Sequence, residues 1–380
     1  MSGLGPILDE ARSLVFVGPG GVGKTSTSAA VAIEAARRGR RAVVLTIDPA
    51  RRLANALGLP EIGSVETDIP PEAFQRAGLT PPAGRLSALM LDIKEAWDDV
   101  IHRYHPDPVQ RQKLLDNRLY HALSTALAGS QEYMAMEKLH RLAHRTEDRP
   151  DLIVLDTPPA THALDFLEAP NRIVDALDND ATRWLLEPSK GGRGLSRRMF
   201  GAGSSLFIKT IARFTGIELL EELAELLGAF SSMFDGFRER ARAVKSLLAE
   251  PETRFCVVGH PSSVGLVDAR SFVERLDERD VHLAAMVLNR ATVDPYSEGS
   301  ADPEGLRRAV ASVGGSRSLA ERLEAVAEDA ARIAREERAG ARALAEDFAR
   351  RPVVVVPELP RDVHDLESLE QLRRHLFAHP

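Results

Sequence analysis

The stretch GPGGVGKTS, residues 18–26, decides the fold. It follows the apolar run SLVFV (13–17) and precedes a helical pattern that begins near Lys24. At such a strand–loop–helix junction, glycines let backbone N–H groups turn inward around phosphate oxygens, the lysine reaches the β- and γ-phosphates, and the threonine hydroxyl ligates Mg²⁺. The pattern therefore predicts a loop that binds a nucleoside triphosphate and is formed by Gly18, Gly20, Gly21, Val22, Gly23, Lys24, Thr25 and Ser26.

Further short runs along the chain are apolar throughout, which is typical of strands buried on both faces of a sheet. They are RAVVLTI (41–47), DLIVL (151–155), FCVV (255–258), LAAMVL (283–288) and PVVVV (352–356). Helical patterns separate them, so the sequence predicts an α/β fold: a parallel twisted sheet flanked by helices. A binding site is expected at the C-terminal ends of the strands.

Two helical regions do not fit simple crossovers between strands. Residues 93–147 and 164–250 are predicted to be insertions that form a helical subdomain within a single domain of residues 1–380. Within the second, Leu220, Leu223, Leu227, Phe230, Phe234 and Phe237 recur at helical spacing. This apolar face, over residues 217–237, either packs inside the insertion or forms a groove for a hydrophobic client. A charged helix is expected over about 317–350.

Composition narrows the classes of function. The formal net charge of −7 gives no general attraction to nucleic acid. The single cysteine, Cys256, lies in an apolar run, so neither a disulfide framework nor a thiolate metal cluster is expected. The first residues lack the pattern of a secretory signal, and no run is long and apolar enough for a membrane helix. We interpret the protein as cytoplasmic.

Two aspartates directly follow predicted strands. Asp48 follows the second strand, where a carboxylate facing the phosphate loop can orient a water for attack on the γ-phosphate. The alternative is that Asp48 only caps a helix that starts near Pro49. Asp156 ends another apolar strand, as in a Walker-B site, where the carboxylate holds Mg²⁺ through its water shell.

Three motifs together resemble a known family. GGVGKTS (20–26), DPARRL (48–53) and DTPPATH (156–162) are similar to the deviant Walker-A ATPases of the SIMIBI class, in the branch that holds the arsenite-pump ATPase and the tail-anchored-protein targeting ATPase of the GET pathway. The resemblance implies a Mg²⁺-dependent ATPase whose nucleotide cycle changes the conformation of a dimer. It also implies that Asp48, with Lys24, is catalytic, and that Thr25 and Asp156 hold the metal.

The resemblance extends toward the C-terminus. Asn289, in VLNR, is similar to the family's adenine-reading asparagine, and an amide suits the adenine edge. The stretch PELPRDVHDLESL (357–369) is similar to the loop over the purine, so Pro357 and Leu359 are expected to contact the base.

One position departs from the family pattern. The deviant motif carries a signature lysine that reaches across the dimer to the partner's nucleotide, but this chain has Pro19 there. Several stretches, among them SQEYMAMEKL (130–139), are similar to one subunit of the paired ArsA/GET-like ATPases of actinobacteria. The chain is therefore predicted to work beside a related, non-identical ATPase subunit that supplies the lysine, with a hydrophobic client or a membrane protein as a further partner.

Other readings remain open at this stage. ATP could serve as a structural ligand of a binding or regulatory module with little turnover, which is consistent with Pro19. The interpretation as an anion-pump subunit is weakened by the lack of cysteines, and that as a DNA-partitioning ATPase by the acidic balance.

Six histidines are considered as candidate site residues. Four of them are predicted to be surface residues: His102, His105, His140 and His144. The other two, His162 and His260, lie near expected switch loops.

Overall fold

The computed structural model of the chain describes residues 3–47, 52–126, 130–157, 168–169, 172, 175, 226, 229–230, 233–279, 281–297, 302–348 and 351–378. The chain divides into two compact units. The first holds residues 1–90, 142–164 and 248–380, and the second holds residues 91–141 and 165–247. The prediction that both belong to one domain, with helical insertions at 93–147 and 164–250, stays a prediction.

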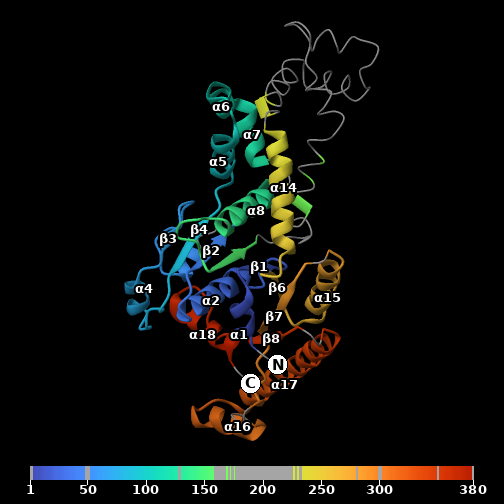
Figure 1. Cartoon of the computed structure of the whole chain (residues 1–380). Coiled ribbons are helices and arrows are strands. Elements are labelled where there is room, and N and C mark those ends of the chain that lie inside the picture. Colours follow the sequence, from blue (N-terminus) through green and yellow to red (C-terminus); the bar gives the residue numbers. More distant parts are fainter. Residues whose placement is uncertain are drawn as a thin grey trace. The chain divides into compact units, whose positions relative to one another are not determined.

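The first unit is built on one sheet (Figure 1) with the strand order β3-β4-β2-β5-β1-β6-β7-β8. All neighbouring strands run parallel except the edge pair β3–β4. The predicted α/β fold with a mostly parallel sheet is confirmed, and β3 and β4 are additional. The strands are β1 (Ser13–Val17), β2 (Ala42–Thr46), β3 (Thr67–Asp68), β4 (Leu86–Met90), β5 (Leu152–Asp156), β6 (Thr253–Gly259), β7 (Leu283–Ala291) and β8 (Val353–Pro357).

The register of the central strands aligns their C-terminal ends. Asp156, the last residue of β5, is the Cα partner of Phe16 in β1 and of Thr46 in β2. The phosphate-loop sequence follows β1 directly, so the loop emerges beside Asp156. Parallel pairing thus brings together residues that lie far apart in the sequence.

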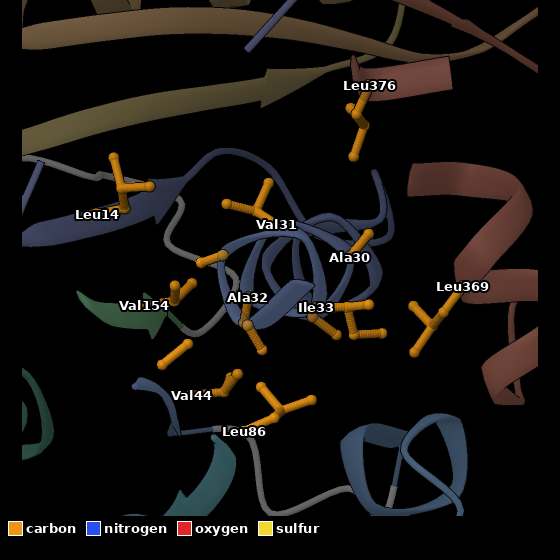
Figure 2. Packing of buried hydrophobic residues seen from close by; sticks show 14 of the residues in the cluster. Leu14, Ala30, Val31, Ala32, Ile33, Val44, Leu86, Val154, Leu369 and Leu376 are labelled. Carbon is orange, nitrogen blue, oxygen red and sulfur yellow. The ribbon is translucent and has the colours of Figure 1, made fainter. Parts of the chain in front are cut away.

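Helix α2 (Lys24–Arg37) covers the centre of the sheet. Its alanines at 29, 30, 32, 35 and 36 are fully buried, and such small side chains let the helix approach the strands closely. Figure 2 shows α2 between the strand residues Leu14, Val154 and Val44 and the leucines of α18 (Leu366–Phe377). Burial of this apolar surface is the main stabilising contribution to the layer.

Ion pairs also hold α18 on α2. The Glu34 carboxylate pairs with Arg373, and Arg37 pairs with Glu370 at 3.3 Å. The helix begins at a capping box in which Asp365 and Ser368 satisfy each other's backbone N–H groups. Residues 357–365 connect β8 to this cap, so the packing of α18 fixes the C-terminal end of that segment.

The remaining helices of the first unit are α1 (Gly5–Glu10), α3 (Arg52–Ala56), α4 (Pro71–Arg76), α15 (Ser263–Asp277), α16 (Pro303–Ser312) and α17 (Arg317–Asp347). The predicted charged helix is confirmed as α17, with Ser316 as its N-cap. Its buried Glu337 accepts a hydrogen bond from the backbone N–H of Thr292 at 2.6 Å. This contact anchors the chain immediately after β7.

The second unit is helical in its described part. It contains α5 (Ile93–Tyr104), α6 (Pro108–Leu115), α7 (Arg118–Ala126) and most of α8 (Ser130–Ala143) and α14 (Phe234–Ala249). Its core gathers the aromatic side chains of Trp97, Tyr120, Tyr133, Phe230 and Phe237. No helix among the residues described for either unit has the length and apolar character needed to cross a bilayer.

Two predictions for this unit have different outcomes. Within the predicted apolar face, Phe234 and Phe237 are buried and Phe237 packs on Trp97, which favours packing for this part; its leucines lie outside the described residues. The prediction that His105 is a surface residue is wrong. Its side chain is buried, with ring nitrogens 2.9 and 3.0 Å from the carbonyl oxygens of Asp107 and Ala229.

Candidate functional site

The loop after β1 has the backbone shape of a phosphate cradle. Gly18 and Gly23 have φ values of +149° and +94°, where a side chain would be strained. A Cβ at Gly18 would overlap the carbonyl oxygen of Val258 in β6, and one at Gly23 would overlap the amide nitrogen of Asn289 in β7. The loop therefore lies tightly against two strands, and only glycine fits at these positions.

Lys24 is buried and its side chain folds back over the loop. Its Nζ donates hydrogen bonds to the carbonyl oxygens of Gly18, at 3.0 Å, and Pro19, at 2.8 Å. A cation held at the opening of a ring of backbone N–H groups is suited to an anion. Pro19 contributes a carbonyl oxygen here and no charge.

Thr25, in the first turn of α2, meets Asp156 at the end of β5. The Thr25 hydroxyl donates to Oδ2 of Asp156 at 2.7 Å, and the Thr46 hydroxyl donates to the same oxygen at 3.0 Å. Asp156 is fully buried. Hydroxyl and carboxylate oxygens are the ligands that Mg²⁺ prefers, so this donor set fits the predicted metal. Sequence reasoning missed Thr46, although a polar residue closing an apolar strand was a signal.

The loop after β5 is tied down at its first residue. The Thr157 hydroxyl donates to the carbonyl oxygen of Phe16 at 2.7 Å. The structure does not describe residues 158–167, which include His162, nor residues 48–51. The predicted catalytic residue Asp48 therefore lies outside the described residues.

A cleft of about 570 Å³ opens beside the loop. Among the predicted residues it is lined by Gly21, Gly23, Lys24, Thr25, Ser26, Asn289, Pro357 and Leu359. Gly18, Gly20 and Val22 belong to the loop but not to this lining. The cleft thus joins the predicted phosphate and base regions, which are separated by more than 260 residues in the sequence.

Three arginines that sequence reasoning missed also line the cleft: Arg52, Arg290 and Arg361. All three are exposed at its rim. Together with Lys24 they outnumber the two carboxylates that line the same cleft, Glu358 and Asp362, which favours a polyanionic ligand. The only signal in the sequence was their position beside predicted site residues.

Asn289 reaches the loop from a distorted strand end. The register of β7 against β8 shifts between Leu288 and Ala291, and Arg290 has a φ of +61°, which is rare for a residue with a side chain. The Nδ2 of Asn289 donates to the carbonyl oxygen of Val22 at 2.9 Å, and its side chain is buried.

Other residues named from the sequence do not join this site. Burial raises the pKa of the Cys256 thiol to about 12, so it is an inert core residue. His140 is half-buried and His144 is exposed. The Nδ1 of His260 accepts from the backbone N–H of Ser262 at 3.1 Å. In the part of the chain that the structure describes, no group of His, Cys, Asp or Glu side chains could hold a metal by itself.

A parallel sheet with a glycine-rich loop between its central strand and the following helix, and a strand-end aspartate beside the loop, defines a P-loop nucleoside triphosphatase fold of the SIMIBI type. The chain belongs to the anion-transporting ATPase family, whose family model matches residues 11–302.

Several known proteins are similar to the chain in sequence. It is 28% identical over 281 residues to an uncharacterized protein of Streptomyces coelicolor, covering 73% of this chain and 62% of that relative. It is 27% identical over 302 residues to the ATPase ARSA1 of Chlamydomonas reinhardtii, covering 74% and 35%. The chain thus spans less than two thirds of the length of both. It is 24% identical over 368 residues to the ATPase get3 of Schizosaccharomyces pombe, covering 95% of this chain and 90% of that protein.

Proposed function

We propose that the chain is a Mg²⁺-dependent ATPase whose nucleotide cycle changes the conformation of a dimer. One observation carries the proposal: the Thr25 hydroxyl, next to Lys24 in the chain, contacts the buried carboxylate of Asp156. This arrangement joins a cation and hard oxygen donors at one loop, as phosphoryl transfer requires.

The loop residues have distinct tasks in this proposal. The backbone N–H groups of residues 20–26 surround the phosphates, and Lys24 leaves the carbonyl oxygens of Gly18 and Pro19 to contact the β- and γ-phosphates. Thr25 and Asp156 would hold Mg²⁺, Asp156 through a bound water. When bound, the metal offsets the negative charge of the phosphates. The base lies against Asn289, Pro357 and Leu359 in the cleft.

Asp48 is proposed to position the attacking water. It follows β2 by two residues, and the last residue of β2, Thr46, already contacts Asp156. A carboxylate that emerges at this edge of the sheet can accept a proton from water near the γ-phosphate. The electrostatic contribution of Lys24 and the metal complements this step.

A related, non-identical subunit is the partner that we propose. Because Pro19 offers only a carbonyl oxygen, this chain has no cation at the position where the family carries its signature lysine. A second subunit with that lysine would complete the site in trans. The complex is proposed to act in the cytoplasm on a hydrophobic client or a membrane protein, without nucleic acid.

Two alternatives are favoured by particular observations. The absence of a cation at Pro19 also fits an ATP-gated binding module with little turnover. An anion-pump subunit is favoured by relatives such as the putative arsenical pump-driving ATPase 1 of Aquifex aeolicus, 24% identical over 287 residues, or 73% of this chain and 63% of that protein. The single cysteine, buried with a raised pKa, does not favour metalloid binding.

The test has two parts. Native mass spectrometry of the tagged chain from its own cells, with Mg²⁺ and a non-hydrolysable ATP analogue, identifies any partner subunit. Phosphate release is then measured for the chain alone, for the complex, and for the complex with Asp48→Asn. Turnover that needs the partner and Asp48 supports the proposal. ATP binding without turnover in either form would favour the binding module, and no ATP binding would reject both.

A further inference from the structure

We propose that Asn289 is a positioning residue that couples base recognition to the shape of the phosphate loop. The inference rests on the proposed nucleotide function and goes beyond it. Reading of adenine alone would leave the loop independent of Asn289. The contacts of Asn289 instead place one of its two amide atoms on the loop itself.

The amide orientation follows from its neighbour. Val22 presents a backbone carbonyl oxygen, which only accepts hydrogen bonds, so the atom 2.9 Å from it must be the donating Nδ2. Gly23 leaves room for the same nitrogen, since a Cβ at residue 23 would overlap it. Among the described residues, no donor reaches Oδ1 of Asn289, which therefore can accept from the amino group of a base.

The strand end is shaped to deliver this side chain. Residues 283–289 are buried in succession, and the register shift at 289–290 interrupts regular pairing with β8. Such irregularities re-aim a side chain next to a functional site. The left-handed backbone of Arg290 is strained and is held by the contacts that follow, including Glu337 on Thr292.

Two consequences follow from this geometry. The loop keeps its cradle shape without a base because Nδ2 holds the Val22 carbonyl. A base with an amino group then engages Oδ1 of a side chain that is already fixed, so little further ordering is required on binding. A base with a carbonyl group at the same place would face Oδ1 without a hydrogen bond.

Two substitutions distinguish the role of Nδ2 of Asn289 from that of its Oδ1. Asn289→Asp keeps an acceptor at the position of Oδ1 and replaces the donor by an oxygen that repels the Val22 carbonyl. Asn289→Ala removes both. Asn55→Asp, at an exposed residue of α3 that lines the same cleft, introduces the same charge as a control. Calorimetry measures binding of ATP, GTP and base-free tripolyphosphate, each with Mg²⁺.

We expect Asn289→Asp to weaken tripolyphosphate binding by about tenfold or more relative to Asn55→Asp and to retain the preference for ATP over GTP. Asn289→Ala is expected to weaken tripolyphosphate binding and also to lose the preference for ATP over GTP. Amide hydrogen exchange of a peptide covering 17–28 in the nucleotide-free chain should be faster in both Asn289 variants, whereas exchange of a peptide covering 152–157 should not change. Exchange also provides a measurement that does not depend on binding.

The outcomes are distinct. In one outcome, the Asn289 variants bind ATP more weakly but show unchanged tripolyphosphate binding and unchanged exchange in residues 17–28. Asn289 would then only recognise the base, and the inference would be overturned. A wild-type chain that binds ATP but not tripolyphosphate would also overturn it, because the loop would then not be preformed. A wild-type chain that binds neither would reject the proposed function itself.

Discussion

The hydroxyl of Thr25 lies 2.7 Å from Oδ2 of Asp156, although 131 residues separate them in the chain. The contact exists because β5 pairs with β1 in a register that ends both strands at the same edge. Asp156 is fully buried, so its carboxylate oxygens need hydrogen-bond donors from the protein.

Thr46 is expected to stabilise the buried carboxylate of Asp156 by its hydrogen bond. Thr46→Val keeps the side-chain shape but removes a donor from a buried carboxylate, which should lower the free energy of unfolding by about 1–3 kcal/mol. Urea denaturation measures the loss. Thr25→Val is the matched comparison: it should weaken Mg²⁺-dependent ATP binding by more than Thr46→Val does. Equal effects of the two substitutions on Mg²⁺ dependence would contradict this division of roles.

Lys24 is expected to act on the phosphates. Lys24→Ala should lower ATP turnover by about 10²–10³-fold, since removal of one preorganised positive group from a phosphate site has an effect of this size. Phosphate release gives the rate. Lys245→Ala, which removes an exposed lysine from α14, is the charge control. Comparable turnover in the two variants would exclude the proposed role of Lys24.

Cys256 is expected to be unreactive in the folded chain. Its thiol pKa is raised from an ordinary 9.0 to about 12, mainly by burial. A thiol reagent such as Ellman's reagent should label the native protein only as fast as it unfolds. Because the unfolded thiol ionises near pH 9.0 and the folded one does not, stability should fall as pH rises above that value. In the Cys256→Ala variant, the free energy of unfolding measured with urea should change less with pH between about pH 9 and pH 11.

The buried pair of Glu137 and Arg240 in the second unit should be coupled. Their side chains lie 3.6 Å apart, and the Arg240 guanidinium lies 3.8 Å from the ring centre of Tyr104. Arg240→Met alone should lower the free energy of unfolding by about 3–5 kcal/mol, because it leaves Glu137 buried without its ion partner. Adding Glu137→Gln should recover most of this loss. An exposed pair, Arg317 with Glu321, serves as the control and should contribute less than about 1 kcal/mol.

The pH dependence of the same variant has a definite sign. Burial raises the pKa of the Glu137 carboxyl, so the folded state favours the protonated form. Stability from this group is present at low pH and is lost as pH rises above the ordinary value of 4.5. The deficit of Arg240→Met should therefore shrink as pH falls from about 7.5 to about 5. A constant deficit would show that Glu137 is not the group responsible.

Most of the sheet could be predicted because each of its central strands contains a continuous apolar run. Strand β4, which lies between β3 and β2, escaped prediction because Ser87 interrupts its apolar run; the Ser87 hydroxyl donates to the Glu66 carboxylate at 2.7 Å. The two residues of β3 are too few to leave a pattern. His105 was misjudged because its partner Ala229 is distant in the sequence, and only the fold brings that carbonyl near.

The site residues that belong to a local sequence motif were predictable. The loop residues, Thr25 and Asp156 lie in motifs whose residue types indicate phosphate and metal binding. The bond from Asn289 to Val22 could not be foreseen, because it depends on the irregular end of β7 and the strained backbone of Arg290. The rim arginines could not be foreseen either, because Arg52 begins α3, Arg290 lies in β7 and Arg361 follows β8, and only the fold brings them to one cleft.

The register of β5 has a consequence for engineering. Residues 91–141 precede this strand and residues 165–247 follow it, yet Asp156 is set by its pairing with Phe16 and Thr46 rather than by either segment. A chimera that carries the helical segments of a relative should therefore keep the oxygens of Thr25 and Asp156 in place. Under the proposed function, nucleotide chemistry and the choice of a client would then be separable modules, exchanged without redesign of the sheet.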